Sequence, residues 1–398
     1  MTEIPRIALF ADTFHEINGA ANVLRRLTEF ARECDYPFLC IRSGEKTRLW
    51  DEGNLRILEL KRSRLAIKLD SELKYDPLLW RYKGLVRKTL KDFQPAVLHL
   101  TGFSDVSQIG FYFAHFQRLS AVASWHTNGH EYAARRTLSK ISWLPAKIRE
   151  KFGKLIEKVV LHGSMKIYFL AQVQLAPNEE LVAQMRQMTR RPSFLMSRGV
   201  DSQFLSPSKR QRTDDVFTIG YVGRLRAEKN VRFLGELDAF LREKGLSNYK
   251  FLIVGDGNEE NWLRKNLIRA DFTGVLRGED LARAFANMDL FVFPSRTDAF
   301  GNVVLEAMAA GVPSVVMPEG GPKFLIEHEA NGFVAKNNRD FCEIVVRAIA
   351  EPEKFSAMKL AVRETALTHS WENVFEAVFE KYCLAATLKK NVRATDSG

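Results

Sequence analysis

Residues 293–311 read FPSRTDAFGNVVLEAMAAG, and they carry the clearest structural signal in the chain. The apolar run 290–293 that leads into them predicts a buried strand ending at Pro294. After a polar turn, the mostly apolar residues 303–309 predict a helix that ends at Gly311. A strand, a loop and a helix in this order direct backbone N–H groups and the positive helix end at the space above the sheet. Phosphate is the usual ligand of such a place.

Two carboxylates, Asp298 and Glu306, bracket the turn. Glu306 falls within a helix that is otherwise suited to burial, so we expect it to have a polar partner at the site. The stretch resembles the signature of glycosyltransferase family 4, the retaining nucleotide-sugar glycosyltransferases that fold as two Rossmann-like domains. That signature has two carboxylates separated by seven residues around a Phe-Gly turn, and the first is usually Glu, where this chain has the shorter Asp298. A nucleotide-site loop of another α/β enzyme is the alternative interpretation.

The length of 398 residues suits two domains better than a single core. A hydrophobic fraction of 46% and 28 Phe exclude a largely disordered chain. The four cysteines form no CxxC pair and no metal-binding spacing, as expected of reduced cysteines in a cytoplasmic protein. No signal peptide is evident, and the chain lacks the run of about 18 apolar residues that predicts a membrane-spanning helix.

The formal net charge of +11 includes two basic runs in the first half. Residues 61–91 carry ten Lys or Arg against three acids, and residues 140–158 carry six against two. Both runs interleave bulky apolar residues, such as Trp80 and Phe152, which is typical of a helix that docks on an anionic membrane surface. A solvated helix face with its apolar side in the core is the alternative. Nucleic acid is not expected as a partner, because no recognised binding motif is present.

In the first half, two residues follow predicted strands. The strand at 6–10 leads into a loop that ends in Gly19 at the entrance of a helix, where the absence of a Cβ lets backbone approach a diphosphate. The strand at 121–125 is followed by His126, at the sheet edge where α/β proteins bind ligands. His126 and His130 have the spacing of a metal pair, but no third ligand stands at a fitting distance in sequence, so no metal is predicted. The resemblance instead implies that His126 contacts the hydroxymethyl group of the donor sugar.

The second half repeats the plan of the first. Residues 216–221 predict a strand and residues 230–240 a helix, and the loop between them reads GRLRAEKN. Members of the family have Gly-Arg-Leu followed by Lys here, which Gly223, Arg224 and Lys229 match. Two cations above a sheet edge suit a departing diphosphate, whose negative charge grows as the sugar bond breaks. The alternative is that both are ordinary surface charges.

The resemblance implies a complete set of site residues. The catalytic residues are expected to be His126, Arg224, Lys229 and Asp298. The nucleotide sugar is expected to contact Gly19, Gly223, Val275, Phe300, Gly301, Asn302 and Glu306. Glu306 would accept hydrogen bonds from the two ribose hydroxyls. No cofactor and no metal are expected, because the chain has no D-x-D triplet to hold a donor-bound cation.

The predicted architecture is an α/β chain of two facing Rossmann-like domains, the GT-B fold, with the active site in the interdomain cleft. Residues 1–203 would form the acceptor-binding domain and residues 204–370 the nucleotide-sugar-binding domain. Residues 371–390 would form a helix that crosses back to the first domain, and residues 391–398 are predicted to be a disordered tail.

These features predict a retaining transferase that moves a hexose from a UDP- or GDP-linked donor to an acceptor hydroxyl. The acceptor is expected to be a membrane glycolipid or a lipid-linked saccharide, which would place the enzyme peripherally on the inner face of the cytoplasmic membrane. A soluble sugar or polysaccharide is the alternative acceptor. Retention could use a double displacement with Asp298 as the nucleophile. The resemblance implies that Asp298 binds sugar hydroxyls instead, so a front-face substitution is the preferred route. A sugar-nucleotide epimerase of the same fold and a non-catalytic binding module are the alternatives from other functional classes.

Overall fold

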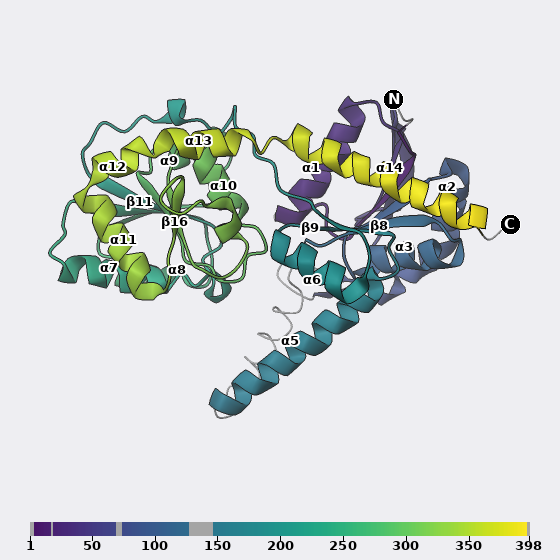
Figure 1. Cartoon of the computed structure of the whole chain (residues 1–398), viewed down its shortest axis with the longest axis horizontal. Coiled ribbons are helices and arrows are strands. Elements are labelled where there is room, and N and C mark those ends of the chain that lie inside the picture. Colours follow the sequence, from purple (N-terminus) through teal and green to yellow (C-terminus); the bar gives the residue numbers. More distant parts are fainter. Residues whose placement is uncertain (1–3, 17–18, 69–73, 127–145, 396–398) are drawn as a thin grey trace. The chain divides into compact units, whose positions relative to one another are not determined.

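The computed structural model describes residues 4–16, 19–68, 74–126 and 146–395, which form two compact units (Figure 1). The first unit contains Met1–Ser197 and Glu372–Gly398, and the second contains Arg198–Trp371. The domain limits expected from the sequence were 203/204 and 370/371, whereas the units change at 197/198 and 371/372, six residues earlier and one residue later. Each unit has its own sheet and its own core.

The first unit is built on an eight-stranded sheet with the strand order β10-β9-β8-β7-β1-β2-β4-β3. Neighbouring strands are parallel except for β3 and β4. The strands of this sheet are β1 (Ile7–Ala11), β2 (Phe38–Gly44), β3 (Arg48–Glu52), β4 (Leu55–Lys61), β7 (Val97–Leu100), β8 (Ser120–Ser124), β9 (Val173–Ala176) and β10 (Ser193–Leu195). A short ribbon pairs β5 (Ile67–Lys68) with β6 (Lys74–Tyr75). The helices are α1 (Gly19–Glu33), η1 (Pro77–Tyr82), α2 (Lys83–Phe93), α3 (Asp105–Phe116), α5 (Ala146–Tyr168), α6 (Glu179–Thr189) and α14 (Trp371–Thr395).

The C-terminal helix α14 packs on the first sheet. The ring of Phe379 lies 6.4 Å from that of Phe38 on β2 and 4.7 Å from that of Tyr36. The Ser120 hydroxyl, at the start of β8, donates to the carbonyl oxygen of Ala385 at 3.0 Å. A predicted C-terminal helix that joins the first unit is therefore present, and it completes the core of that unit.

The C-terminal helix is longer than predicted. The predicted helix ends at residue 390 and is followed by a disordered tail, whereas α14 continues to Thr395. Residues 391–395 contain no Pro or Gly that would end a helix, so the helical hydrogen bonds continue through them. Residues 396–398 lie outside the described residues.

The second unit has a six-stranded sheet, entirely parallel, with the strand order β13-β12-β11-β14-β15-β16. Its strands are β11 (Phe217–Val222), β12 (Tyr249–Val254), β13 (Ala270–Gly274), β14 (Leu290–Phe293), β15 (Ser314–Val316) and β16 (Gly332–Val334). Its helices are η2 (Pro207–Lys209), η3 (Ala227–Lys229), α7 (Phe233–Glu243), α8 (Glu260–Asn266), α9 (Gly278–Ala286), α10 (Asn302–Ala309), η4 (Pro322–Leu325), α11 (Asn338–Ala350), α12 (Pro352–Ala357) and α13 (Lys359–Leu367). The predicted α/β class with two Rossmann-like units is confirmed. Among the described helices, none combines the length and the apolar character that crossing a membrane requires.

Residues 293–311 fold as predicted, with the fully buried strand β14 leading into α10. Gly301 before the helix and Gly311 after it have φ values of +89° and +72°, a region that favours glycine. The helix predicted from residue 230 begins only at Phe233. Asn230 itself adopts a left-handed conformation that separates the short turn η3 from α7.

Each sheet reverses its strand order at one place, and open α/β sheets bind ligands at such switch points. The reversal lies between β1 and β7 in the first sheet and between β11 and β14 in the second. At the first switch point, the Asp12 carboxyl group accepts hydrogen bonds from the backbone N–H groups of Ser104 and Ser107, each at 2.8 Å. These groups belong to the N-terminus of α3, where the helix dipole favours negative charge.

Candidate functional site

The carboxyl edge of the second sheet collects the residues predicted to bind the donor. The loop after β11 carries Gly223, Arg224 and Lys229, and the loop after β14 carries Asp298 and leads to Glu306 on α10. Because β11 and β14 are neighbours in the sheet, both loops start side by side at its switch point. The structure thus gathers the predicted cations and carboxylates at one edge.

Lys229 and Asp298 form an ion pair. The Lys229 Nζ lies 2.6 Å from Oδ1 and 2.8 Å from Oδ2 of Asp298, and only 14% of the first side chain and 20% of the second are exposed. Burial alone would raise the pKa of Asp298, but the positive charges of Lys229 and Arg224 hold it below its ordinary value. The carboxylate is therefore ionised at neutral pH. Both residues were predicted to belong to the site, but their pairing was not predicted.

Arg224 stands beside this pair in the loop after β11. Its Nη2 lies 3.9 Å from Oε1 of Glu228, and the Tyr221 hydroxyl donates to its backbone carbonyl oxygen at 3.2 Å. The Thr297 hydroxyl donates to the Glu228 carbonyl oxygen at 3.2 Å, which ties the two loops together. Glu228 was missed, because nothing in the sequence pattern separates it from a surface acid.

Glu306 is half-buried on α10, and burial raises the pKa of its carboxyl group to about 7. Within the part of the chain that the structure describes, that carboxyl group has no hydrogen-bond or ion-pair partner. The polar partner that we expected is therefore not supplied by these residues. A desolvated carboxyl group with unused acceptor oxygens is suited to hydroxyl donors from a ligand.

The turn that precedes α10 is held by close packing. A Cβ on Gly301 would lie 2.7 Å from Cγ of Pro322, and the N–H group of Gly321 donates to the carbonyl oxygen of Asp298 at 2.6 Å. Phe300 is buried, and Asn302 is the first residue of α10. The N–H groups of Val304 and Leu305 donate to the Gly301 carbonyl oxygen, whereas that of Asn302, the first helical residue, has no intrahelical acceptor and suits an anion.

Arg198 packs against this turn and was not predicted from the sequence. It is buried, and its guanidinium carbon lies 5.9 Å from the centre of the Phe300 ring. Burial lowers the pKa of Arg198 to about 10, still well above neutrality, so a charged group packs against the turn. The residue stands at the boundary between the units, where the sequence pattern gives no sign of a contact with position 300.

Gly223 and Val275 lie at the same sheet edge as Lys229. Gly223 has a φ of +150°, and its N–H group donates to the carbonyl oxygen of Val254 at 3.0 Å. Gly255, which we did not predict, is needed for the close approach of two loops, since a Cβ there would lie 2.0 Å from the Gly223 carbonyl oxygen. Val275 directly follows β13 and is exposed. These positions border the space above β11, β12 and β13.

The two predicted site residues of the first unit also follow strands of its sheet. Gly19 is the first residue of α1 and is exposed. His126 follows β8, and its Nε2 lies 2.6 Å from the hydroxyl oxygen of Ser124. His130 lies outside the described residues. Among the residues described, no three His, Cys, Asp or Glu side chains are grouped closely enough to hold a metal ion.

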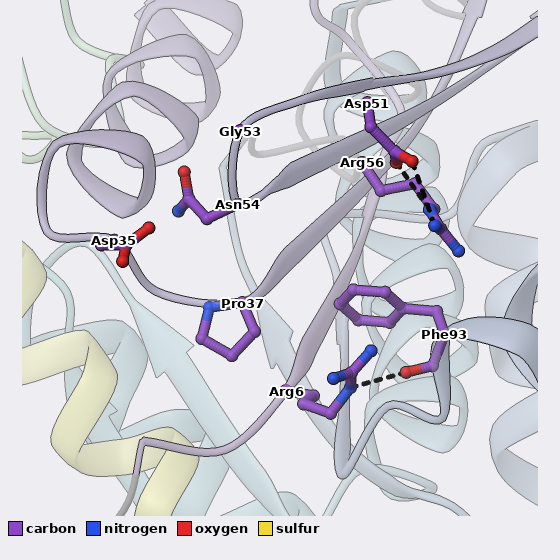
Figure 2. A pocket seen from close by; sticks show the side chains of 8 residues that line it. All are labelled: Arg6, Asp35, Pro37, Asp51, Gly53, Asn54, Arg56 and Phe93. Carbon is purple, nitrogen blue, oxygen red and sulfur yellow. Dashed lines mark hydrogen bonds and ion pairs between the residues drawn. The ribbon is translucent and has the colours of Figure 1, made fainter.

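A pocket of about 370 Å³ opens at the other end of the first sheet, where its strands begin (Figure 2). The Arg6 guanidinium group donates to the Phe93 carbonyl oxygen at 2.6 Å, and Arg56 forms a bidentate ion pair with Asp51. Figure 2 shows Arg6 directed at the backbone of Phe93 and, separately, Arg56 directed at Asp51. None of the residues that line this pocket is a predicted site residue.

Helix α5 exposes a row of apolar side chains. Phe152, Leu155 and Val159 share one helix face, with 44%, 55% and 62% of each side chain exposed. The core of the first unit is instead contacted by the buried Met165 and Tyr168 farther along the helix. Figure 1 shows α5 extending away from the sheet of its own unit. Lys154 and Lys158, which precede Leu155 and Val159 on the same helix, are also exposed.

The basic run 61–91 is arranged differently. Helix α2 turns Val86 and Leu90 into the core, as in the alternative interpretation of a solvated helix face. Several cations of the run have partners within the unit, since Arg81 donates to Asp76 at 3.2 Å and the Lys83 ammonium group lies 4.0 Å from the centre of the Tyr112 ring. This run therefore offers less uncommitted charge than its composition indicates.

Residues 216–351 match the family model described as glycosyl transferases group 1. Two relatives extend over nearly the whole chain, and both are named GDP-mannose-dependent alpha-mannosyltransferase. The protein of Corynebacterium glutamicum is 27% identical over 99% of this chain and 92% of its own length, and that of Mycolicibacterium smegmatis is 27% identical over 95% and 96%.

Solved structures show the same fold. Sucrose-phosphate synthase of Thermosynechococcus elongatus superposes with a TM-score of 0.73 at 17% identity, covering 96% of this chain and 98% of its own. Anabaena HepE, solved with UDP and glucose, superposes with a TM-score of 0.65 at 17% identity, covering 95% and 99%. The chain therefore has the GT-B fold, and its residues 216–351 match the group 1 glycosyl transferases.

Proposed function

We propose that the protein transfers mannose from GDP-mannose to an acceptor hydroxyl with retention of the anomeric configuration. The names of the two full-length relatives support guanosine as the base and mannose as the sugar. The observation that carries the proposal is the Lys229–Asp298 ion pair beside Arg224 at the switch point of the second sheet. At this edge of the sheet, Lys229 and Arg224 provide cations for the leaving diphosphate, and Asp298 provides a carboxylate for the sugar hydroxyls.

The diphosphate is held by cations and backbone rather than by metal. A lysine ammonium group has three N–H bonds, and two of those on Lys229 are directed at Asp298, which leaves the third for a phosphate oxygen. Arg224 supplies a second, planar donor group. The N–H groups at the start of α10 complete the set, with Phe300, Gly301 and Asn302 as the residues involved. Fixed donors of this kind stabilise the charge that develops on the leaving group.

The ion pair favours a front-face substitution over a double displacement. In a double displacement, Asp298 would attack the anomeric carbon, but both of its oxygens accept hydrogen bonds from Lys229. A carboxylate engaged in this way is a poorer nucleophile than one that faces only the sugar. In the front-face route, the departing phosphate oxygen takes the proton of the acceptor hydroxyl while that hydroxyl attacks from the same side. Asp298 then orients a sugar hydroxyl.

The remaining predicted residues bind the nucleoside and the sugar. The unpartnered carboxyl group of Glu306 accepts from the two ribose hydroxyls. Gly223 and Val275 border the base through backbone groups. From the first unit, Gly19 contributes backbone to the diphosphate, and His126 contacts the transferred sugar.

The acceptor is a lipid or lipid-linked saccharide at an anionic membrane, reached through α5. The support is the exposed row Phe152, Leu155 and Val159, whose apolar side chains gain by leaving water. The exposed Lys154 and Lys158 add attraction to anionic headgroups. A soluble saccharide is the alternative acceptor, and an assay that offers both kinds of acceptor distinguishes the two.

The experiment incubates the purified protein with GDP-mannose, UDP-glucose and other nucleotide sugars, each with anionic lipid extract or with soluble saccharides. Products are identified by mass spectrometry, and the anomeric configuration is read by NMR. The proposal expects α-mannosylated lipid from GDP-mannose, formed equally well with and without a chelator. A new free sugar nucleotide without acceptor would indicate an epimerase, and binding without any turnover would indicate a binding module.

A further inference from the structure

A chain of hydrogen bonds links His126 to the C-terminal helix. The Ser124 hydroxyl oxygen lies 2.6 Å from Nε2 of His126 and 2.7 Å from Nε2 of His99. Nδ1 of His99 lies 2.7 Å from the Tyr382 hydroxyl on α14. Ser124, His99 and Tyr382 are all fully buried. The chain therefore runs from the core of the first unit to the carboxyl edge of its sheet.

The direction of these hydrogen bonds follows from Tyr382. Its hydroxyl has one hydrogen, and within the described residues Nδ1 of His99 is its only hydrogen-bond partner. Burying an O–H group without an acceptor is unfavourable, so Tyr382 donates to Nδ1 of His99. Burial lowers the pKa of His99 to about 3, so its ring is neutral and has a single N–H group. With Nδ1 acting as acceptor, that N–H group is at Nε2.

The hydrogen bonds from His99 through Ser124 to His126 run in the same direction. The Nε2–H of His99 donates to the Ser124 hydroxyl oxygen, so the hydroxyl hydrogen of Ser124 points to its other neighbour, Nε2 of His126. Within the described residues, the Ser124 hydroxyl has no third partner. In its neutral form, His126 then carries its hydrogen on Nδ1.

We propose that Tyr382 is a positioning residue for His126, because the chain through His99 and Ser124 fixes both the tautomer and the orientation of the His126 ring. His126 then offers Nδ1–H as a hydrogen-bond donor, while its Nε2 is occupied as an acceptor and cannot take a proton from a substrate without breaking the chain. The proposal rests on the proposed function only in giving His126 a sugar oxygen to contact. The tautomer itself depends on the first unit alone.

The tautomer is measured by NMR of protein labelled with ¹⁵N in its histidine rings, with the His126→Gln variant used to identify the signals of His126. The expected spectrum of neutral His126 has the hydrogen on Nδ1 in the unliganded protein. Tyr382→Phe removes the donor to His99, so both directions of the chain become available and the His126 signals shift toward a mixture of tautomers. Ser124→Ala cuts the chain at its last step and has the same effect on His126.

Activity provides the second readout. Tyr382→Phe and Ser124→Ala each lower kcat by roughly 3- to 10-fold, the effect of losing one net hydrogen bond, and leave the affinity for GDP unchanged. The matched control is Ser120→Ala, which removes a separate hydrogen bond between the first sheet and α14, from Ser120 to Ala385, and leaves the four residues of the chain unchanged. It leaves the His126 signals and kcat at their wild-type values.

Hydrogen on Nε2 of neutral His126 in the wild type would overturn the proposal. So would an unchanged His126 spectrum in Tyr382→Phe, or an equal loss of kcat in Ser120→Ala, which would reduce Tyr382 to a contact that docks the helix. A spectrum that changes in Tyr382→Phe while kcat does not would overturn the positioning role. If the protein transfers no sugar at all, the proposed function fails and the NMR result decides this inference by itself.

Discussion

Asp298 and Glu306 lie in one loop–helix segment, yet the pKa values of their carboxyl groups are shifted in opposite directions. Burial alone would raise the pKa of Asp298, but the charges of Lys229 and Arg224 and the hydrogen bonds to the carboxylate together lower it. Burial raises the pKa of Glu306 to about 7, and none of the described residues pairs with its carboxyl group. Near neutral pH the first carboxylate is firmly ionised and the second titrates. The two therefore respond differently to pH, to substitution and to ligand.

Stability should fall as pH rises through the titration of Glu306. A carboxyl group whose pKa rises from 4.5 to about 7 on folding binds its proton more tightly in the folded state. The folded protein thus holds more protons between these pH values, and its free energy of unfolding decreases with rising pH in that window. Glu306→Gln should flatten this decrease, as followed by denaturant unfolding at about pH 5, 6 and 7, which span this window. The control Glu364→Gln changes an exposed acid of the same unit and should keep the wild-type slope.

Nucleotide binding should depend on the same carboxyl group. Glu306→Gln should weaken GDP binding by about 1–3 kcal/mol, the usual contribution of a hydrogen bond to a charged acceptor. In the wild type, calorimetric affinity for GDP should increase as pH rises through about 7, since only the ionised carboxylate accepts from both ribose hydroxyls. Equal GDP affinity in the variant and the wild type at all pH values would remove Glu306 from the nucleotide site.

Arg224→Ala should lower turnover by roughly 10²–10³-fold, as the loss of one fixed donor to developing charge does. The fold should be retained, because the Arg224 side chain is only partly buried. Lys229→Ala is a less clean test, since it leaves the carboxylate of Asp298 without its cation in a largely buried place, which costs about 3–5 kcal/mol of stability. Steady-state kinetics and thermal unfolding measured together separate the two effects, and wild-type turnover in Arg224→Ala would contradict the assignment.

Asp298→Asn should reduce sugar transfer while GDP still binds. The amide keeps the shape of the side chain and loses the charge that orients a sugar hydroxyl and pairs with Lys229. GDP affinity is expected to stay the same or to increase, because the lysine is released for phosphate. Loss of GDP binding in this variant would reverse the roles of the two carboxylates.

Membrane attachment should depend on the exposed row of α5. The protein should sediment with phosphatidylglycerol vesicles at low salt and dissociate at high salt, since surface charges are screened. Replacing Phe152, Leu155 and Val159 by Ser should abolish sedimentation, and Lys154→Glu with Lys158→Glu should weaken it by about 10-fold or more. The control replaces Leu360 and Leu367 by Ser, two equally exposed leucines of the second unit. A wild-type protein that stays in the supernatant at low salt would end the membrane proposal and leave the transferase proposal intact.

Much of the second unit's edge was predictable because strand, turn and helix signals lie close together in sequence. The sequence of residues 290–311 predicts the strand, the helix and the positions of the two carboxylates, and Gly301 predicts the turn before α10. Contacts between distant positions were not predictable. The pairing of Lys229 with Asp298 depends on which strands become neighbours, and the contact of Arg198 with Phe300 crosses about a hundred residues that no periodicity connects.

The position of Asp12 shows that the two Rossmann-like units differ in whether the helix N-terminus at the switch point can bind an anion. Its carboxyl group occupies the amino end of α3 and takes up the N–H groups of Ser104 and Ser107. A phosphate that bound there would have to displace the Asp12 carboxyl group. Because this group belongs to the same chain, its effective concentration at the helix N-terminus is very high. In the second unit the corresponding edge presents Lys229, Arg224 and an uncapped helix start instead. The first unit therefore brings a built-in substitute for a ligand, and the second leaves its place open to molecules from solution.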